Sequence, residues 1–208
     1  MTNAPHPLQL CFIGDSFVAG IGDETALGWT GRLVARAALQ GHPVTAYNLG
    51  IRKNTSTDIR ARHAGEVALR LSPERRTRLV FSFGVNDATL ADGAPRVSLE
   101  ESFANLSAIL AEARDHTPFF VGPPAVDDER SNAHLEVLNA GFRRICIDHD
   151  VPYVDTFAVL VAHPLWRQQV REGDGAHPRS QGYAVLAETV TPAWDRWFTQ
   201  GVSPDRGK

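Results

Sequence analysis

Cysteine is scarce in this sequence of 208 residues, which has only two. Cys11 and Cys146 lie far apart in apolar stretches and lack metal-ligand spacing, a pattern typical of buried thiols rather than of a disulfide or a nucleophile. No apolar run approaches the roughly 18 residues that a membrane-spanning helix needs. The first residues also lack the basic segment and the apolar run of a signal peptide. We therefore expect a cytoplasmic protein without a membrane span.

Charge of one sign is also in short supply. The formal net charge is -3 at pH 7, with 21 lysines and arginines against 24 aspartates and glutamates. Such a balance creates no strong field toward nucleic acids or anionic membranes, so neither is an expected partner. The composition leaves the oligomeric state open.

The chain is long enough, and with 43% hydrophobic residues apolar enough, to bury one sizeable core. It has no internal repeat and no linker, so we expect a single domain over residues 1–208. Short apolar segments alternate with helical patterns. Strands are expected at 8–13, 44–49, 78–84, 118–122 and 151–155, and helices at 28–40, 56–71, 98–114, 132–150 and 180–198. Ser98 and Glu101 are expected to form a capping box, and Pro192 to kink or divide the last helix.

The alternation of strands and helices predicts the α/β fold class, with a central parallel sheet of about five strands. Right-handed crossovers leave few topologies, and a flavodoxin-like strand order is the simplest of them. In such sheets ligands bind beyond the carboxyl ends of the strands. A functional site is therefore expected at that edge.

Polar turns follow the first three predicted strands. They read GDS at 14–16, NLG at 48–50 and GVND at 84–87. Because the strands are predicted to be parallel, these turns should open at one edge of the sheet. The segment DGAHP at 174–178 precedes the last helix, and we expect its loop to lie over the same edge.

Together these turns supply the groups that acyl transfer needs. A serine hydroxyl is a weak nucleophile at neutral pH and needs a neighbouring base. We predict that Ser16 is the nucleophile, that His177 is its base and that Asp174 orients the imidazole. The tetrahedral intermediate needs hydrogen-bond donors for its oxyanion. The candidates are the backbone N–H groups of Ser16 and Gly50 and the side-chain amide of Asn86.

The four motifs, in this order along nearly the whole chain, resemble the SGNH hydrolases, also called the GDSL esterase/lipase family. The resemblance rests on GDSF at 14–17, the glycine of NLG at 48–50, GVND at 84–87 and DGAHP at 174–178. It implies a three-layer α/β/α fold and hydrolysis of esters or thioesters without a cofactor or metal. It also implies the same nucleophile, base, orienting acid and oxyanion donors as the residues themselves suggest.

Two positions depart from the family pattern. Phe17 stands where leucine is usual, which we interpret as a change of local packing. The segment after Gly50 contains Arg52 and Lys53, whereas many relatives have a second glycine near position 53. This departure alters the shape and charge expected of one pocket wall and leaves the chemistry intact. Arg52 and Lys53 either face an anionic substrate or are solvated surface.

Several other residues have competing interpretations. Trp29 and Trp166 either wall an acyl pocket or pack in the core. Asp15 and Asp87 are expected to accept local hydrogen bonds that shape their loops. The acidic run at 127–129 predicts a solvated loop rather than a metal site, because no further ligand has the required spacing.

We predict a serine hydrolase that cleaves small acyl esters or thioesters through an acyl-enzyme intermediate. An alternative keeps the same machinery and acts on acetyl groups of carbohydrates. A third interpretation, less favoured, is a binding module whose loops hold a ligand without turnover. Loops at 88–97, 124–133 and 163–173 are expected to shape the pocket, but their sequences do not identify the natural substrate.

Overall fold

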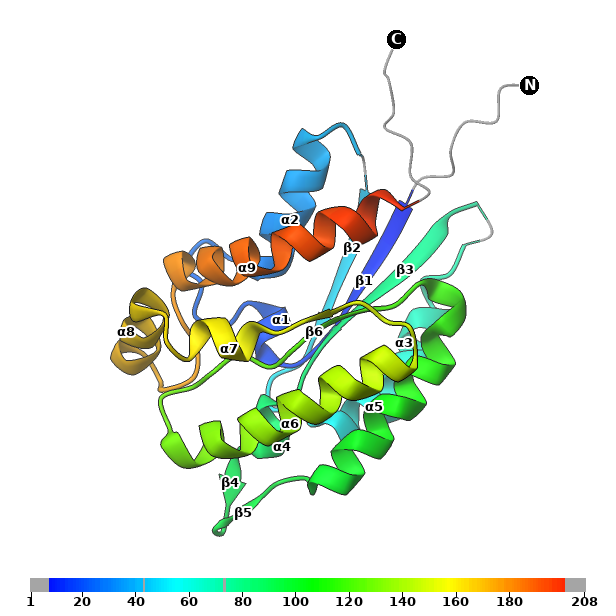
Figure 1. The fold of residues 1–208 in the computed structure, drawn as a ribbon. Coiled ribbons are helices and arrows are strands. Elements are labelled where there is room, and N and C mark those ends of the chain that lie inside the picture. Colours follow the sequence, from blue (N-terminus) through cyan, green and yellow to red (C-terminus); the bar gives the residue numbers. More distant parts are fainter. Residues whose placement is uncertain (1–7, 43, 73, 201–208) are drawn as a thin grey trace, which may run out of the picture.

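A central sheet of five parallel strands organises the molecule (Figure 1). The computed structural model describes residues 8–42, 44–72 and 74–200. The strands are β1 (Leu8–Gly14), β2 (Val44–Gly50), β3 (Arg76–Ser82), β6 (Phe119–Val121) and β7 (Tyr153–Val154). Their order is β2-β1-β3-β6-β7, which is the flavodoxin-like order. The predicted fold class is therefore confirmed.

Helices cover both faces of the sheet and complete three layers. Figure 1 shows α2 and α9 together on one side and α3, α5 and α6 on the other, and the members of each group also contact one another. The long helices are α2 (Gly28–Leu39), α3 (Ser56–Ala68), α5 (Leu99–Ala113), α6 (Glu129–Asp148) and α9 (Ser180–Thr199). The short elements are α1 (Ser16–Ala19), α4 (Val85–Ala88), β4 (Leu90–Ala91), β5 (Ala94–Pro95), η1 (Arg114–His116), α7 (Thr156–Leu160) and α8 (Pro164–Glu172).

The centre of the sheet is buried on both faces, which explains the apolar run of β1. Every residue of β1 is buried, whereas β2 at the edge of the sheet is only partly buried. A strand that is covered on both faces reads as a continuous apolar run rather than as an alternating one. The core also includes Trp194, Trp197 and Phe198 of α9, so these aromatic side chains pack inside the protein.

The register of the first three strands brings their carboxyl ends level with one another. Gly14 of β1 pairs with Gly50 of β2 and with Ser82 of β3. The chain therefore leaves all three strands at the same edge. This register places the segments after β1, β2 and β3 side by side, as the sequence predicted for the functional site.

Caps define where two of the helices begin. Thr55 caps α3 and forms a capping box with Asp58. Ser98 caps α5 by accepting the backbone N–H of Glu101, but the carboxylate of Glu101 accepts the hydroxyl of Thr57 at 2.8 Å. The expected box at Ser98 is thus half formed. Pro192 does not divide α9, which runs without interruption from Ser180 to Thr199.

Two segments that were expected to be loops contain regular structure. Residues 164–172 form α8, which has Pro164 in its first turn and His163 as its N-cap. Proline suits that position, since the first N–H groups of a helix have no intrahelical acceptor. Residues 90–95 form the β4–β5 hairpin, in which Asp92 and Gly93 have positive φ values of 52° and 85°. Both segments are therefore ordered elements rather than irregular loops.

Both cysteines are free and buried, as predicted. Burial raises the pKa of the Cys11 thiol to about 11, and burial also raises the pKa of Cys146. Both thiols therefore stay protonated at neutral pH. None of the helices in the described part of the chain is long and apolar enough to cross a membrane.

Candidate active site

Ser16 lies at a sharp turn from strand to helix. Asp15 follows β1 directly and caps α1, because its side chain accepts the backbone N–H of Phe17 at 2.9 Å. Ser16 is then the first residue of α1. This turn places the hydroxyl of Ser16 beyond the carboxyl end of the central strand, although only 5% of the residue is exposed.

A chain of hydrogen bonds joins Ser16, His177 and Asp174. Nε2 of His177 lies 2.7 Å from Oγ of Ser16, and Nδ1 lies 2.8 Å from Oδ2 of Asp174. A neutral imidazole has one N–H, and the carboxylate attracts it to Nδ1. Nε2 is then left as an acceptor for the hydroxyl proton of Ser16. The structure thus brings together the three side chains that the sequence predicted as nucleophile, base and orienting acid.

The loop before α9 holds Asp174 ionised. Its Oδ1 accepts the backbone N–H groups of His177 at 2.8 Å and Ala176 at 3.1 Å. Partial burial works against the charge, but the hydrogen bonds from the backbone and ring of His177 and from Ala176 outweigh it and lower the pKa of Asp174 to about 2. Asp174 is therefore a carboxylate at neutral pH.

Phe17 supports the imidazole from the side. Its ring centroid lies 4.9 Å from that of His177, and it also stacks on Trp166 with ring centroids 6.4 Å apart. Only 2% of Phe17 is exposed. The aromatic residue that departs from the family motif is therefore a packing residue, as expected, and the ring that it packs against is that of the predicted base.

Asn86 lies on the segment after β3, close to the residue that precedes Ser16. Gly84, with a φ of 127°, provides the turn that begins α4, and such a φ favours glycine. The Nδ2 atom of Asn86 donates to the backbone carbonyl of Asn54 at 3.0 Å and lies 3.4 Å from Oδ2 of Asp15. The side-chain amide thus contacts the turn after β2 and the residue next to Ser16, and its role as an oxyanion donor stays a prediction.

Gly50 has a steric role in this structure. A Cβ atom at this position would lie 2.2 Å from the backbone N of Ala19, so only glycine lets β2 pack this closely against α1. Its N–H, which the sequence suggested as an oxyanion donor, donates to Oδ1 of Asn48 at 3.0 Å. That N–H is therefore already engaged, and the donor role of Gly50 stays a prediction.

Lys53 occupies a backbone conformation that favours glycine. Its φ is 65°, in the left-handed region. A glycine would adopt this conformation without strain, so Lys53 keeps the turn at some conformational cost. Arg52 and Lys53 are both exposed. The turn is joined to the site because the carbonyl of the next residue, Asn54, accepts the amide of Asn86.

Arg62, which sequence reasoning missed, ties this turn to the end of β1. Its guanidinium donates to the carbonyl of Gly14 at 2.8 Å and to Oδ1 of Asn54 at 2.7 Å, and it pairs with Glu66 at 2.7 Å. In the sequence Arg62 is one arginine among several on a helix. No local signal singles it out, because its partner Gly14 is 48 residues away.

Asp15 accepts a local hydrogen bond from Phe17, as predicted, whereas the partners of Asp87 lie on other helices. Asp87 accepts the backbone N–H of Ser56 at 2.7 Å and the hydroxyl of Ser102 at 2.9 Å, which joins α4 to α3 and α5. Burial raises the pKa of Asp87. Burial also raises the pKa of Asp15, to about 7, against the opposing effect of the Phe17 N–H. Both carboxyl groups shape the loops that carry the predicted catalytic groups.

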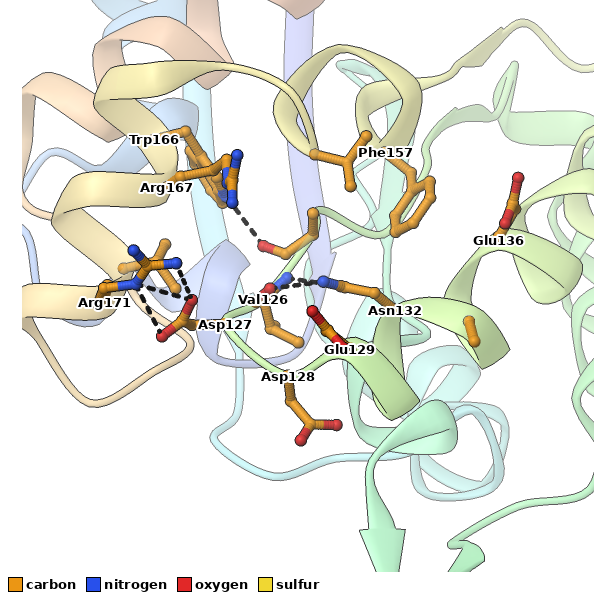
Figure 2. Close-up of a pocket in the computed structure, with 14 residues that line it drawn as sticks. Val126, Asp127, Asp128, Glu129, Asn132, Glu136, Phe157, Trp166, Arg167 and Arg171 are labelled. Atoms are coloured by element: carbon orange, nitrogen blue, oxygen red, sulfur yellow. Dashed lines mark hydrogen bonds and ion pairs between the residues drawn. The ribbon is translucent and has the colours of Figure 1, made fainter.

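A cavity of about 530 Å³ lies between the start of α6 and helices α7 and α8 (Figure 2). Trp166 lines it, and its indole N–H donates to the carbonyl of Ala125 at 2.8 Å. The residues that line this cavity do not include Ser16, Asn86 or His177. Trp166 thus lines this cavity and stacks on Phe17, and its part in an acyl pocket stays a prediction.

Trp29 requires a correction. It is completely buried and packs edge-on against Phe12 of β1, with ring centroids 5.8 Å apart. It lies in the core, so it does not wall an acyl pocket. The reason is that α2 turns this face toward the sheet, which the sequence pattern left open.

The acidic run after β6 has structural partners. Asp128 caps α6 by accepting the backbone N–H of Ser131 at 2.6 Å. Asp127 pairs with Arg171 of α8 at 3.2 Å, and Figure 2 shows this pair at the edge of the cavity. Within residues 8–42, 44–72 and 74–200, no group of three or more His, Cys, Asp or Glu side chains is arranged to hold a metal ion.

A serine, a histidine and an aspartate in hydrogen-bonded series at the carboxyl edge of a parallel sheet are the arrangement that serine hydrolases use. A family model described as "GDSL-like Lipase/Acylhydrolase family" matches residues 12–185. The protein belongs to the GDSL-like lipase/acylhydrolase family and is an acyl hydrolase, so the resemblance seen in its motifs is confirmed. No curated protein matches the chain in sequence.

Solved structures of low sequence identity share the fold. A lipase/acylhydrolase from Enterococcus faecalis is 22% identical with a TM-score of 0.79, and the match covers 96% of this chain and 100% of that one. TesA is 22% identical with a TM-score of 0.72, covering 91% and 99%. Axe2, an acetylxylan esterase from Geobacillus stearothermophilus, is 20% identical with a TM-score of 0.69, covering 97% of each chain. At these identities the likeness establishes the fold.

Proposed function

We propose that the protein is a serine hydrolase that cleaves small acyl esters or thioesters through an acyl-enzyme on Ser16. The observation that carries this proposal is the pair of short contacts from His177, 2.7 Å to Ser16 and 2.8 Å to Asp174. A second serine–histidine contact in the protein supplies a control for this proposal. Ser107 lies 2.9 Å from Nε2 of His149, but no aspartate or glutamate pairs with that histidine among the described residues.

In the first half-reaction Oγ of Ser16 attacks the acyl carbonyl carbon while Nε2 of His177 takes the hydroxyl proton. The carbonyl π pair moves to oxygen and forms an oxyanion. When this intermediate collapses, the bond to the leaving oxygen or sulfur breaks, and His177 returns its proton to that atom. In the second half-reaction a water molecule repeats the sequence on the acyl-enzyme and releases the acid.

The oxyanion needs donors that are already in place. The backbone N–H of Ser16 and the Nδ2 atom of Asn86 are the groups that we assign to it. The long contact of Asn86 with Asp15, at 3.4 Å, is the one that an oxyanion would replace. Removing one such donor typically lowers turnover by roughly 10²–10³.

The test is hydrolysis of para-nitrophenyl esters, from acetate to decanoate, by wild type, Ser16→Ala and Ser107→Ala. We expect Ser16→Ala to lose nearly all turnover. Ser107→Ala, the matched control, should keep the wild-type rate because its histidine lacks an acidic partner. Equal turnover by wild type and Ser16→Ala would refute the proposal.

A second candidate function is removal of acetyl groups from carbohydrates by the same residues. The observation that favours it is the likeness in fold to Axe2 over 97% of each chain. Acetylated xylo-oligosaccharides, assayed beside the para-nitrophenyl series, separate the two functions. High activity on the sugars with little on acyl chains longer than acetyl would favour the carbohydrate esterase.

A further inference from the structure

Three cationic residues lie on the two segments next to the side chain of Asn86. Arg52 and Lys53 lie on the turn after β2, and Arg96 follows β5 of the hairpin. All three residues are exposed. We call these three residues the cationic rim. They come from two segments that are far apart in the sequence.

Arg96 fixes the position of the cationic rim beside Asn86. One end of its guanidinium donates to the carbonyl of Lys53 at 3.1 Å, and the other lies 3.4 Å from Oδ1 of Asn86. Its own backbone N–H donates to the carbonyl of Thr89, which holds it at the base of the hairpin. Arg96 therefore joins the hairpin, the turn after β2 and the predicted oxyanion donor.

The charges of the cationic rim are not neutralised by a direct ion pair within the described residues. Other exposed arginines have such partners, for example Arg36 with Asp195 at 2.7 Å and Arg171 with Asp127 at 3.2 Å. The positive charge of Arg96 acts on Asp58 and Asp87, but both carboxylates accept hydrogen bonds from other groups. Asp58 accepts the N–H and the hydroxyl of Thr55, and Asp87 accepts from Ser56 and Ser102. The cationic rim therefore carries three charges without a direct ion pair among the described residues.

We propose that the cationic rim binds an anionic group, a carboxylate or a phosphate, on the ester or thioester substrate. The proposal rests on the function proposed above, because it assumes that the acyl carbonyl sits between Ser16 and Asn86. With the oxyanion beside Asn86, a negative group a few atoms from the carbonyl reaches Arg96 and the turn that carries Arg52 and Lys53. Arginine suits this role because its planar guanidinium binds oxyacid groups through two N–H donors.

The experiment compares two pairs of esters that differ in charge. Mono-para-nitrophenyl adipate against para-nitrophenyl hexanoate places the charge in the acyl half. Para-acetoxybenzoate against para-acetoxybenzamide places it in the leaving half. The quantity measured is the ratio of kcat/KM for the anionic ester to kcat/KM for the neutral one. This ratio cancels any effect that a variant has on the chemical step through Asn86.

We expect wild type to favour the anionic ester in at least one pair, through KM more than through kcat. The ratio should fall about 2- to 5-fold for each charge removed in Arg96→Gln and in the double variant Arg52→Gln/Lys53→Gln, the range expected of exposed charge pairs. Arg96→Lys should keep much of the preference, and added salt should weaken it. Arg144→Gln removes an exposed charge from α6 and should leave the ratio unchanged.

Two outcomes would overturn the proposal while leaving the hydrolase intact. One is turnover of the neutral esters with no anionic preference in either pair. The other is a preference that survives removal of all three charges of the cationic rim. If wild type turned over neither member of either pair, the result would count against the proposed function as well, so the two failures are distinguishable.

Discussion

Replacing Asp174 by asparagine should cripple turnover while leaving the fold intact. An asparagine carbonyl can still accept the backbone N–H groups of Ala176 and His177, which Asp174 accepts at 3.1 and 2.8 Å. The loop should therefore keep its shape. The second carboxylate oxygen, Oδ2, is replaced by an NH₂ group. This group donates a hydrogen bond toward Nδ1 of His177, whereas Oδ2 accepts one from it.

The size of the effect follows from the tautomer of the imidazole. With a donor facing Nδ1, the ring proton moves to Nε2, which then cannot accept the proton of Ser16. The same change in a buried serine-protease triad lowers kcat by about 10⁴. The side chain of Asp174 is 51% exposed, and water therefore competes for Nδ1. We expect a loss of about 10³ in kcat, which corresponds to about 4 kcal/mol of transition-state stabilisation.

The assay is steady-state hydrolysis of para-nitrophenyl acetate by wild type, Asp174→Asn and Asp127→Asn. Asp127 is a matched control, since it is an acid on a neighbouring loop whose partner is Arg171 rather than His177. Its replacement should leave kcat nearly unchanged. A loss smaller than tenfold in a folded Asp174→Asn protein would show that the site works as a serine–histidine pair and that the orienting role of Asp174 is wrong.

Three further predictions concern groups that support the site. Phe17→Ala should lower the free energy of unfolding by about 3–5 kcal/mol, because the side chain is fully packed; urea denaturation measures this, and unchanged stability would contradict the packing. Arg62→Gln should lower kcat more than it changes KM, because Gly14 and Asn54 lose a shared hydrogen-bond donor. Steady-state kinetics with an ester substrate measure both constants, and a change in KM alone would contradict this prediction. Burial raises the pKa of Asp15 from 3.8 to about 7 in the folded protein. The protonated Asp15 therefore contributes fully to stability below pH 3.8, and this contribution is lost as the pH rises through about 7. The unfolding free energy of wild type should therefore fall over this range relative to Asp15→Asn, and parallel pH profiles would refute the assignment.

The sequence predicted the sheet and the groups at its edge because both depend on local patterns. Strands buried on both faces read as apolar runs, and the turns after them carry polar residues at fixed places. The order of the strands then brought Ser16 and Asn86 to one edge. His177 and Asp174 were predicted from a short motif, and that motif forms a compact loop whose own backbone holds the carboxylate.

The parts that the sequence did not predict depend on long-range packing. Arg62 and Arg96 act on partners in other segments, and nothing in their neighbouring residues marks them. Trp29 was ambiguous because a tryptophan on an amphipathic helix suits both a pocket and a core, and the orientation of α2 decides between them. The engagement of the Gly50 N–H by Asn48 was equally hidden, since it depends on the side-chain conformation of a residue at the sheet edge.

The central claim is that Ser16 is a nucleophile activated by His177, and covalent labelling tests it most directly. Wild type, Ser16→Ala and His177→Ala are treated with a fluorophosphonate and analysed by intact-protein mass spectrometry, with peptide mapping of the adduct. The account predicts one adduct per chain in wild type, located on Ser16. It predicts no adduct in Ser16→Ala and a greatly slowed reaction in His177→Ala. A wild-type protein that stays unlabelled, or one labelled equally well without Ser16, would contradict it.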